Sequence, residues 1–391
     1  MIETPLNVED SVDRMSSSLR NVRLIDQKLI ADPVDLKGCV MKTGSMKDLY
    51  VCDTRNYSSQ CVVADEIGSV PYEIDKRIKE AICGDVYTGF KLQYVDNNKY
   101  KRAEMIVIKV ISLHKVAQLK QSCTLQEDPV KEICILQKFN AMSGNVCDQI
   151  DCIRDDKFIY SIMSHYGEEL FNYAGKLTED ETRDYFRQIV NGVNTLQSMD
   201  VCHRDLSLEN ILLSPDGVCT IIDFGMSLVY PTAKESTFNT FFHKLSNQVP
   251  CTKDIINDCK KVILMPPQGT CGKKNYIAPE VLANLEPFNG AMVDNWALGV
   301  ILFMLLTGRP PFHRASMLDK WYRMIQEEKL REMLSIWKVE GLSGGAVDLL
   351  QKLLKGSNYN TNRMTTDDIL QHSWLAPAPP SPSNAEDSIQ C

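Results

Sequence analysis

The stretch from Val201 to Gly225 reads VCHRDLSLENILLSPDGVCTIIDFG, and it indicates both the fold and the chemistry of the chain. It places Asn210 five residues after Asp205, and Asp223 begins the closing triplet Asp-Phe-Gly. The Asp205 carboxylate can accept a proton from a hydroxyl group, and oxygens of Asn210 and Asp223 suit Mg²⁺, a hard cation. Loop and capping acids are the plain alternative for each acid alone. The two triplets in this order favour a catalytic site.

The arrangement H-R-D-L-x-x-x-N followed by D-F-G resembles the catalytic core of the protein kinase family. The resemblance implies ATP as phosphoryl donor, Asp205 as catalytic base, and Asn210 and Asp223 as ligands of Mg²⁺, with Mn²⁺ as an alternative. It also implies an α+β fold of two lobes. A small β-rich N-lobe carries helix C, and a larger C-lobe is α-helical. The expected substrate is a serine or threonine hydroxyl of a protein.

A strand rich in β-branched residues is predicted over 103–112, AEMIVIKVIS. Its I-V-I-K matches the family's V-A-I-K, so the resemblance implies that Lys109 holds the α- and β-phosphates. Asp128-Pro129 is a helix start, with an N-cap acid and proline at the first position. Glu132 on that helix is the expected partner of Lys109. Glu127 is the competing carboxylate, but it precedes the helix start.

The segment Glu80 to Leu92, EAICGDVYTGFKL, resembles the end of the family's glycine-rich loop. The pattern G-x-G-x-x-G-x-V falls on Lys79, Ala81, Gly84 and Val86, so one glycine of three is present. Glycine in such a loop allows backbone N–H groups to approach phosphates closely. Taken alone, the segment would be an ordinary hairpin.

The stretch 157–171, KFIYSIMSHYGEELF, resembles the fifth strand, the hinge and the start of the next helix of a kinase. Met163 is then the gatekeeper. Glu169 has two readings, an acid for the ribose or a basic substrate residue, or a solvated acid at a helix start. The expected nucleotide-binding residues are Lys109, Gly84, Val86, Val107, Met163, Ser164, Tyr166, Glu169 and Leu212.

Helical patterns dominate the second half of the chain. An amphipathic helix is predicted over 178–199, with Thr178 as N-cap and a glutamate three residues on. NYIAPEV at 275–281 matches the family's A-P-E site, and VDNWALGVILFMLLTGRPPF at 293–312 matches the helix that anchors the large lobe. The resemblance implies that Asp294 holds the catalytic loop backbone and that Arg363 pairs with Glu280.

The domain boundaries follow from where the resemblance begins and ends. Residues 1–71 form an N-terminal extension, in which Leu19, Val22, Ile25 and Leu29 have helical spacing and 60–67 resembles a strand. The extension is either an arm packed on the domain or a docking or autoinhibitory segment. The expected kinase domain is 72–375, divided into N-lobe 72–163 and C-lobe 167–375. Within it the activation segment 223–280 is long, and a Pro/Ser-rich disordered tail at 376–391 follows.

The amino-acid composition limits the classes of partner and the compartments that are expected for this chain. The formal net charge of the 391 residues is -8, which argues against a nucleic-acid partner. The apolar run from Trp296 to Leu306 is too short to span a bilayer, so no membrane association is expected. Fourteen cysteines without a C-x-x-C pair fit reduced thiols in the cytoplasm, with the nucleus as an alternative.

Two positions beside the catalytic motif are unusual. The family carries lysine two residues after the catalytic Asp, where this chain has Ser207, and threonine in the G-T-x-x-Y turn, where it has Lys273. We hypothesise that the two groups have exchanged places, so that Lys273 supplies a catalytic charge. A register through Gly269 and Thr270 is the alternative. Ser207 and the altered glycine loop also favour a second class, a kinase-like scaffold without phosphotransfer.

Expected protein partners follow from charged residues near the motif. Glu209, and with it Glu169, favours substrates with a basic residue before the target hydroxyl. Arg204 can pair with a phosphate in the activation segment, which would imply an upstream activating kinase and makes Thr270 the candidate phosphosite, ahead of Thr252. A constitutively ordered insert that needs no phosphate is the alternative. Tyrosine specificity is disfavoured, because Ser207 and Glu209 stand where tyrosine kinases usually carry arginine.

Overall fold

The structure is a computed structural model of the whole chain. The residues that it describes are 24–26, 39–41, 49–52, 61–63, 72–96, 99–122, 127, 129–139, 144–154, 157–229, 254–257, 260–265, 267, 269–356 and 363–376. The predicted tail after residue 376, most of the extension 1–71 and Thr252 lie outside this set.

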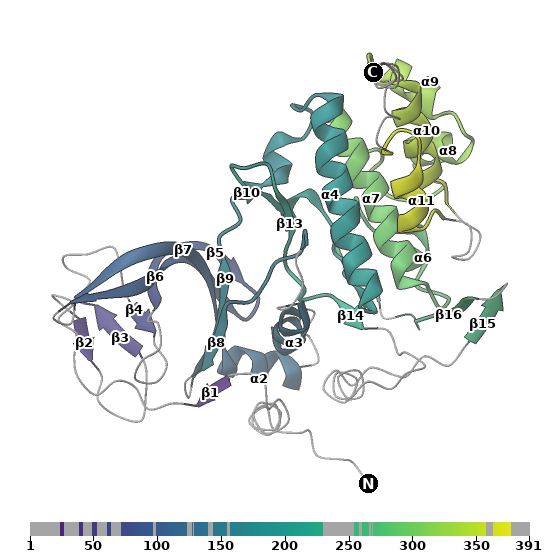
Figure 1. Ribbon diagram of the computed structural model, residues 1–391. Helices are drawn as coiled ribbons and strands as arrows, with labels where there is room; N and C mark the ends of the chain where they lie inside the picture. The colour runs from purple at the N-terminus through teal and green to yellow at the C-terminus, as the bar shows by residue number, and fades with distance from the viewer. Residues whose placement is uncertain are drawn as a thin grey trace, which may run out of the picture.

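A nine-stranded sheet forms the N-terminal lobe, on the left of Figure 1. Its strand order is β1-β8-β9-β7-β6-β5-β4-β3-β2, and neighbours are antiparallel except β1 and β8. The strands are β1 (Leu24–Asp26), β2 (Cys39–Met41), β3 (Leu49–Cys52), β4 (Cys61–Val63), β5 (Tyr72–Ala81), β6 (Gly84–Asp96), β7 (Lys99–Ser112), β8 (Asp151–Arg154) and β9 (Phe158–Ser164).

Strand β7 alternates between two environments, as a pleated strand must. Ile106 and Ile108 are fully buried in a cluster on one face of the sheet. Ile111 belongs to a second cluster, which includes Ile133 of helix α3 (Pro129–Phe139). Since Lys109 is two residues from Ile111, its side chain emerges on the face that α3 covers. This face is the one directed at the predicted site.

Two helices accompany the sheet. Helix α2 (Leu113–Gln121) begins at Ser112, whose hydroxyl accepts a hydrogen bond from Lys115 N. Helix α3 begins at Pro129, the position that the sequence predicts, while the expected cap Asp128 lies outside the described residues. The α+β class of the prediction is therefore confirmed.

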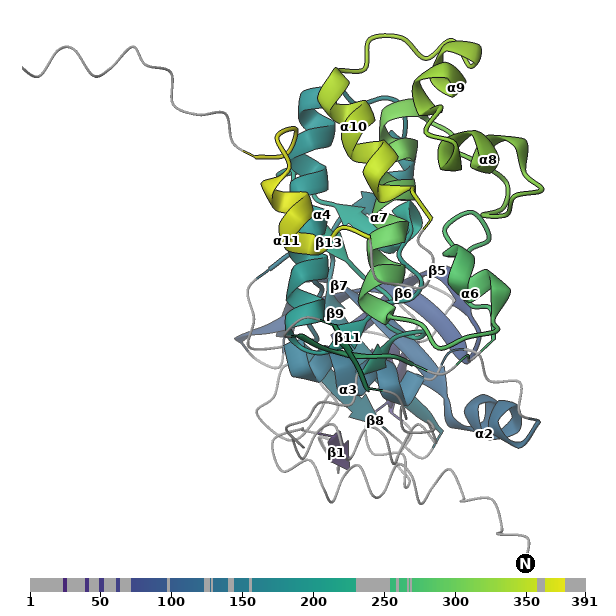
Figure 2. The same cartoon turned by 90° about the vertical axis from the view of Figure 1, so that its right-hand side faces the viewer.

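The C-terminal lobe is a bundle of helices around α4 and α7, on the right of Figure 1. Figure 2 shows α11 beside α4 and α10 beside α7. The helices are α4 (Glu179–Ser198), α6 (Pro279–Ala283), α7 (Gly290–Thr307), α8 (Lys320–Gln326), α9 (Leu330–Ile336), α10 (Gly344–Leu353) and α11 (Thr366–Gln371).

Helix α7 is the core of this lobe. Its 18 residues are apolar enough to cross a membrane by length and composition alone, so the predicted short run lies within a longer helix. However, 83% of the helix is buried inside the protein. A helix that is apolar all round is buried in this way at the centre of a large domain.

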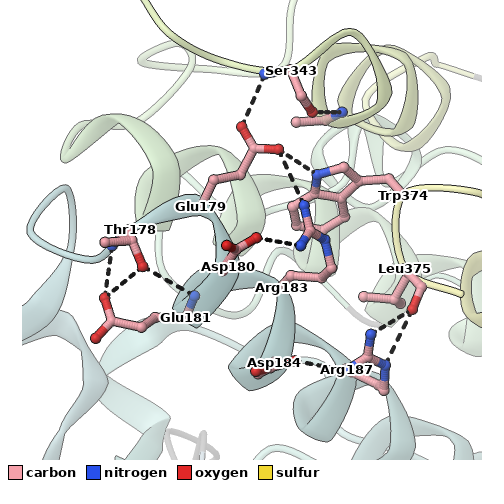
Figure 3. A network of polar contacts seen from close by, with 11 residues as sticks. Thr178, Glu179, Asp180, Glu181, Arg183, Asp184, Arg187, Ser343, Trp374 and Leu375 are labelled. Carbon is pink, nitrogen blue, oxygen red and sulfur yellow. Dashed lines mark hydrogen bonds and ion pairs between the residues drawn. The ribbon is translucent and has the colours of Figure 1, made fainter. Parts of the chain in front are cut away.

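Figure 3 shows how the N-terminus of α4 is tied to the end of the domain. The predicted cap is present, since Thr178 and Glu181 form a reciprocal capping box. Glu179 accepts hydrogen bonds from Trp374 Nε1 at 2.7 Å and from Ser343 N at 2.9 Å. Arg187 donates twice to the Leu375 carbonyl. The described chain therefore ends anchored on α4.

The helical spacing in the extension was misleading at one place. Leu24–Asp26 forms strand β1, which pairs in parallel with β8 at the sheet edge. Edge pairing satisfies backbone hydrogen bonds that a local pattern cannot reveal. The predicted strand at 60–67 is represented by β4.

Candidate active site

The loop after β11 (Val201–Cys202) is held by its backbone. The Asp294 carboxylate of α7 accepts hydrogen bonds from His203 N at 2.7 Å and from Arg204 N at 2.9 Å. Arg204 has φ of 68°, a left-handed conformation that costs free energy in a non-glycine residue. The buried carboxylate stabilises this bend, and the bend sets the position of Asp205.

Asp205 is oriented from two sides. Asn210 Nδ2 donates to Asp205 Oδ2 at 3.0 Å and to the Asp205 carbonyl at 2.8 Å. The backbone N–H of Lys273 donates to Asp205 Oδ1 at 2.9 Å. Each carboxylate oxygen thus has a hydrogen-bond donor and keeps further lone pairs. The side chain is 15% exposed, so a substrate hydroxyl can reach it.

Asp223 follows strand β13 (Cys219–Ile221) and has φ of 70°. The next residue, Phe224, is fully buried and fixes the turn. Its ring lies 5.4 Å from that of Phe139 in α3 and 5.0 Å from that of His203. The two lobes therefore meet at the residue next to Asp223.

Lys109 and Glu132 form an ion pair between β7 and α3, with Nζ and Oε2 2.5 Å apart. Burial alone would lower the pKa of Lys109, but the charges of Glu132 and then Asp223 raise it well above its usual range. The competing carboxylate, Glu127, lines the same pocket as Lys109 and lies close to Gly225, where an added Cβ would be 3.2 Å from its Cβ, but the described contacts contain no ion pair between Glu127 and Lys109. The predicted choice of Glu132 as the residue that pairs with Lys109 matches this geometry.

The carboxylate of Asp223 is suited to binding a cation, because the charged groups around it keep it ionised. Burial alone would raise the pKa of Asp223, but the charges of Lys109, then Lys79, lower it below its usual value, so the carboxylate is ionised. Among the described residues no cluster of three or more His, Cys, Asp or Glu could hold a metal alone. Two oxygen ligands from Asp223 and Asn210 are the set expected for Mg²⁺ that also binds phosphates. These residues fit that ion.

Lys273 reaches the catalytic loop from a distant part of the chain. Its Nζ lies 2.7 Å from Ser207 Oγ, 3.3 Å from Asn210 Oδ1 and 3.7 Å from Asp205 Oδ2. The preceding Gly272 has φ of 90°, and an added Cβ would lie 2.9 Å from the Arg204 carbonyl oxygen. Gly269 has nothing within 4 Å of that position. The turn against the loop therefore runs through Gly272 and Lys273, not through the alternative register.

The predicted nucleotide residues lie on neighbouring strands. In the β7–β9 pairing Val107 is opposite Met163, and in β6–β7 Val86 is opposite Lys109. Leu212 of β12 (Ile211–Leu213) is opposite Glu169 of β10 (Glu168–Glu169). Ser164 ends β9 and is half-buried.

Two of these residues have particular environments. The Tyr166 hydroxyl is engaged by Asp148, accepting from its backbone N–H at 2.8 Å and donating to its carboxylate. At this position the hinge can therefore offer a nucleotide its backbone groups, but not the Tyr166 hydroxyl. Glu169 is exposed, in accordance with either reading of its role.

The tip of the β5–β6 hairpin is a turn of Ile82 and Cys83. An added Cβ on Gly84 would lie 1.8 Å from the Val110 carbonyl oxygen, so glycine is required here by close approach of β7. A pocket under the tip is lined by Lys109, Glu132 and Glu127. The sequence pattern alone did not reveal Lys79 as part of the site. Its register opposite Val86, which is itself opposite Lys109, places it on the same face.

Comparison with known proteins agrees with this geometry. A family model described as "Protein kinase domain" matches residues 95–375. CBL-interacting serine/threonine-protein kinase 15 of Arabidopsis thaliana is 32% identical over 307 residues, which are 78% of this chain and 61% of that protein. CBL-interacting protein kinase 31 of Oryza sativa subsp. japonica is 29% identical over 308 residues, or 78% and 57%. The chain thus spans about three fifths of the length of these curated relatives.

Proposed function

The chain belongs to the protein kinase family, and from this premise we propose that it transfers the γ-phosphoryl group of ATP to serine or threonine hydroxyls of proteins. The predicted kinase fold is confirmed by the family match. The observation that carries the proposal is the arrangement around Asp205, with Asn210 bonded to its carboxylate and Lys273 N on its other oxygen.

Each residue has a distinct part in the proposed reaction. Asp205 accepts the proton of the attacking hydroxyl, a contribution on the order of 10²–10⁴-fold in general base catalysis. Lys109 contacts the phosphates, and Glu132 holds its ammonium at 2.5 Å. Asp223 and Asn210 would hold Mg²⁺, which would supply neutralisation of the phosphate charge.

We propose substrates with a basic residue near the target hydroxyl. Glu209 lies in the short 3-10 helix Leu208–Asn210, four residues after Asp205, and it accepts a hydrogen bond from Tyr276. A charge-assisted pair from Glu209 to arginine would contribute about 1.5–3 kcal/mol when partly desolvated. A peptide array tests this preference, and equal phosphorylation with and without arginine would refute it.

An upstream activating kinase is also part of the proposal. Arg204 Nε is buried and, among the described residues, has no hydrogen-bond partner. Thr270 is exposed on the segment that packs beside the loop. A phosphate on this segment would supply an acceptor for Arg204 Nε, which has none among the described residues. The relatives' names record interaction with CBL, but the chain spans only part of those proteins, so we do not extend that interaction to it. Besides the upstream kinase, the partners that we propose are protein substrates.

The second candidate is a kinase-like scaffold without phosphotransfer. It is favoured by Ser207 and by a hairpin whose single remaining pattern glycine is explained by strand packing. The oriented Asp205 and the ionised Asp223 favour the enzyme.

Two substitutions separate the candidates. Asp205→Asn should abolish transfer while Mg-ATP binding, measured by calorimetry, changes little, because Asp205 orients the hydroxyl. Asp223→Asn should weaken Mg-dependent ATP binding as well. Nucleotide binding without transfer in the wild type would instead support the scaffold.

A further inference from the structure

The ammonium that lies beside the catalytic base comes from the segment after Asp223 and not from the catalytic loop. Lys273 Nζ lies within 3.7 Å of oxygens on Asp205, Ser207 and Asn210. These are the base, its neighbour and a metal ligand of the proposed reaction. The loop residues 206–210, LSLEN, contain no lysine or arginine. Among the described residues, the ion pair of Asp205 is therefore the one with Lys273.

The surroundings hold this ammonium in place without enclosing it. Ser207 is fully buried, and its hydroxyl accepts the shortest hydrogen bond of the Lys273 ammonium, at 2.7 Å. The Lys273 side chain remains 37% exposed, so the charge is accessible to a ligand that enters beside Asp205.

We propose that Lys273 is a catalytic residue whose ammonium contacts the transferring phosphoryl group, with Ser207 positioning it. The proposal rests on the phosphotransfer function above. In the reaction the substrate oxygen bonds to the γ-phosphorus, the bond from that phosphorus to the β–γ bridging oxygen breaks, and Asp205 takes the hydroxyl proton. ADP carries away the bond's electron pair. Lys273 forms no covalent bond and stabilises the charge on the phosphoryl oxygens.

The placement has a consequence for control. Lys273 contributes both its ammonium and the N–H that binds Asp205 Oδ1 at 2.9 Å. Both belong to the segment after Asp223, seated through Gly272 against the Arg204 carbonyl. A displacement of this segment would remove the charge together with one of the two hydrogen-bond donors that the described residues give the Asp205 carboxylate, so segment order and turnover are coupled through one residue.

The substitution Lys273→Ala isolates the ammonium, because it retains the backbone N–H that orients Asp205. We expect turnover to fall about 10²-fold, the scale of losing one transition-state donor. ATP affinity should remain within about twofold of wild type, since the contact strengthens in the transition state. Lys274→Ala is the matched control, because Lys274 is the adjacent, exposed lysine, and it should leave turnover unchanged.

The exchange Ser207→Lys/Lys273→Thr tests whether the ammonium at this place is needed, whichever segment carries it. It returns an ammonium and a hydroxyl to the same place from opposite segments, so it should recover much of the turnover that Lys273→Ala loses. Melting temperatures and ATP affinity show that each variant is folded. Lys273→Ala within about threefold of wild type, or a folded exchange variant no more active than Lys273→Ala, would overturn the proposal. An inactive wild type would instead refute the proposed function itself.

Discussion

At the scale of single residues, two glutamates lie near Lys109 but only Glu132 is paired with it in the described contacts. We expect Glu132→Gln to reduce phosphate transfer by about tenfold or more, because the ion pair at 2.5 Å orients the phosphate-binding ammonium. Glu127→Gln is the matched control, since the same charge is removed beside Gly225. Steady-state kinetics measure both. Equal losses in the two variants would contradict the assignment.

Glu127 also predicts a pH dependence of stability. Its pKa is raised, first by burial and then by the charge of Asp223. The folded state therefore binds this proton more tightly than the unfolded state, and ionisation of Glu127 costs stability as pH rises through its folded pKa. Glu127→Gln should raise the melting temperature at pH 7, and this gain should disappear below about pH 4, under the ordinary glutamate pKa. A gain that is independent of pH would exclude the mechanism.

The residues that could be predicted are those in local patterns. Asp205, Asn210 and Asp223 stand in one short stretch, and Lys109 and Glu132 each sit on a strand or helix with a clear signature. The approach of Glu127 to Gly225 depends on the path between α2 and α3, which no periodicity encodes. Asp294 lies ninety positions from Arg204, and only the family resemblance predicted that it holds this backbone, where it accepts the hydrogen bond from Arg204 N.

At the scale of elements, the β5–β6–β7 pairing aligns Lys79, Val86 and Lys109 in one row across the sheet. At Asp223 the charges of Lys109 and then Lys79 outweigh the effect of burial and lower the pKa. At Glu132 burial keeps the pKa raised, and Lys109 and, to a smaller extent, Lys79 oppose it. The row of paired residues and these two effects place the charge of Lys79 on the side of the sheet that carries Lys109. A lysine therefore occupies a place in the hairpin where the family has glycine.

We predict that Lys79→Ala weakens ATP binding by roughly fivefold, the scale of one solvent-exposed charge contact. Adenosine binding should not change, because adenosine has no phosphates. Lys91→Ala is the control, since Lys91 is five positions from Val86 along β6 and so lies on the opposite face. Titration calorimetry with both ligands decides, and an equal effect on adenosine would argue against a phosphate contact.

The elements that could not be predicted are those made by pairing. β1 has helical spacing in its sequence neighbourhood but takes its hydrogen bonds from β8. Gly84 looked like a phosphate-loop glycine, and its packing against Val110 gives it a structural requirement. The pattern of residues within one segment does not indicate which other strand of the chain will lie against its backbone.

At the scale of the whole molecule, a buried ion pair joins the end of the activation segment to the C-terminal region. Arg363 has no exposed side-chain surface and donates to Glu280 at 2.8 and 3.2 Å. Its guanidinium also lies 5.1 Å from the ring of Trp296 in α7. The C-lobe thus holds the residues after the catalytic turn to its central helix.

Breaking this pair should destabilise the fold. We expect Arg363→Ala to lower the free energy of unfolding by about 3–5 kcal/mol, because the Glu280 carboxylate would remain without its partner. Lys329→Ala, which removes an exposed pair with Glu327, should leave the denaturation midpoint nearly unchanged. Urea denaturation compares the two variants. Similar midpoints would show that the buried pair contributes no more to the free energy of unfolding than the exposed pair.

The central claim is that both lobes together form an active phosphotransfer site. The most direct measurement is transfer of labelled phosphate from Mg-ATP to protein substrates by the wild type and by Asp205→Asn, with the labelled residues identified by mass spectrometry. We predict phosphoserine and phosphothreonine with the wild type and a loss of about 10²-fold or more with Asp205→Asn. Equal labelling by both proteins, or none by a wild type that binds Mg-ATP, would contradict the claim.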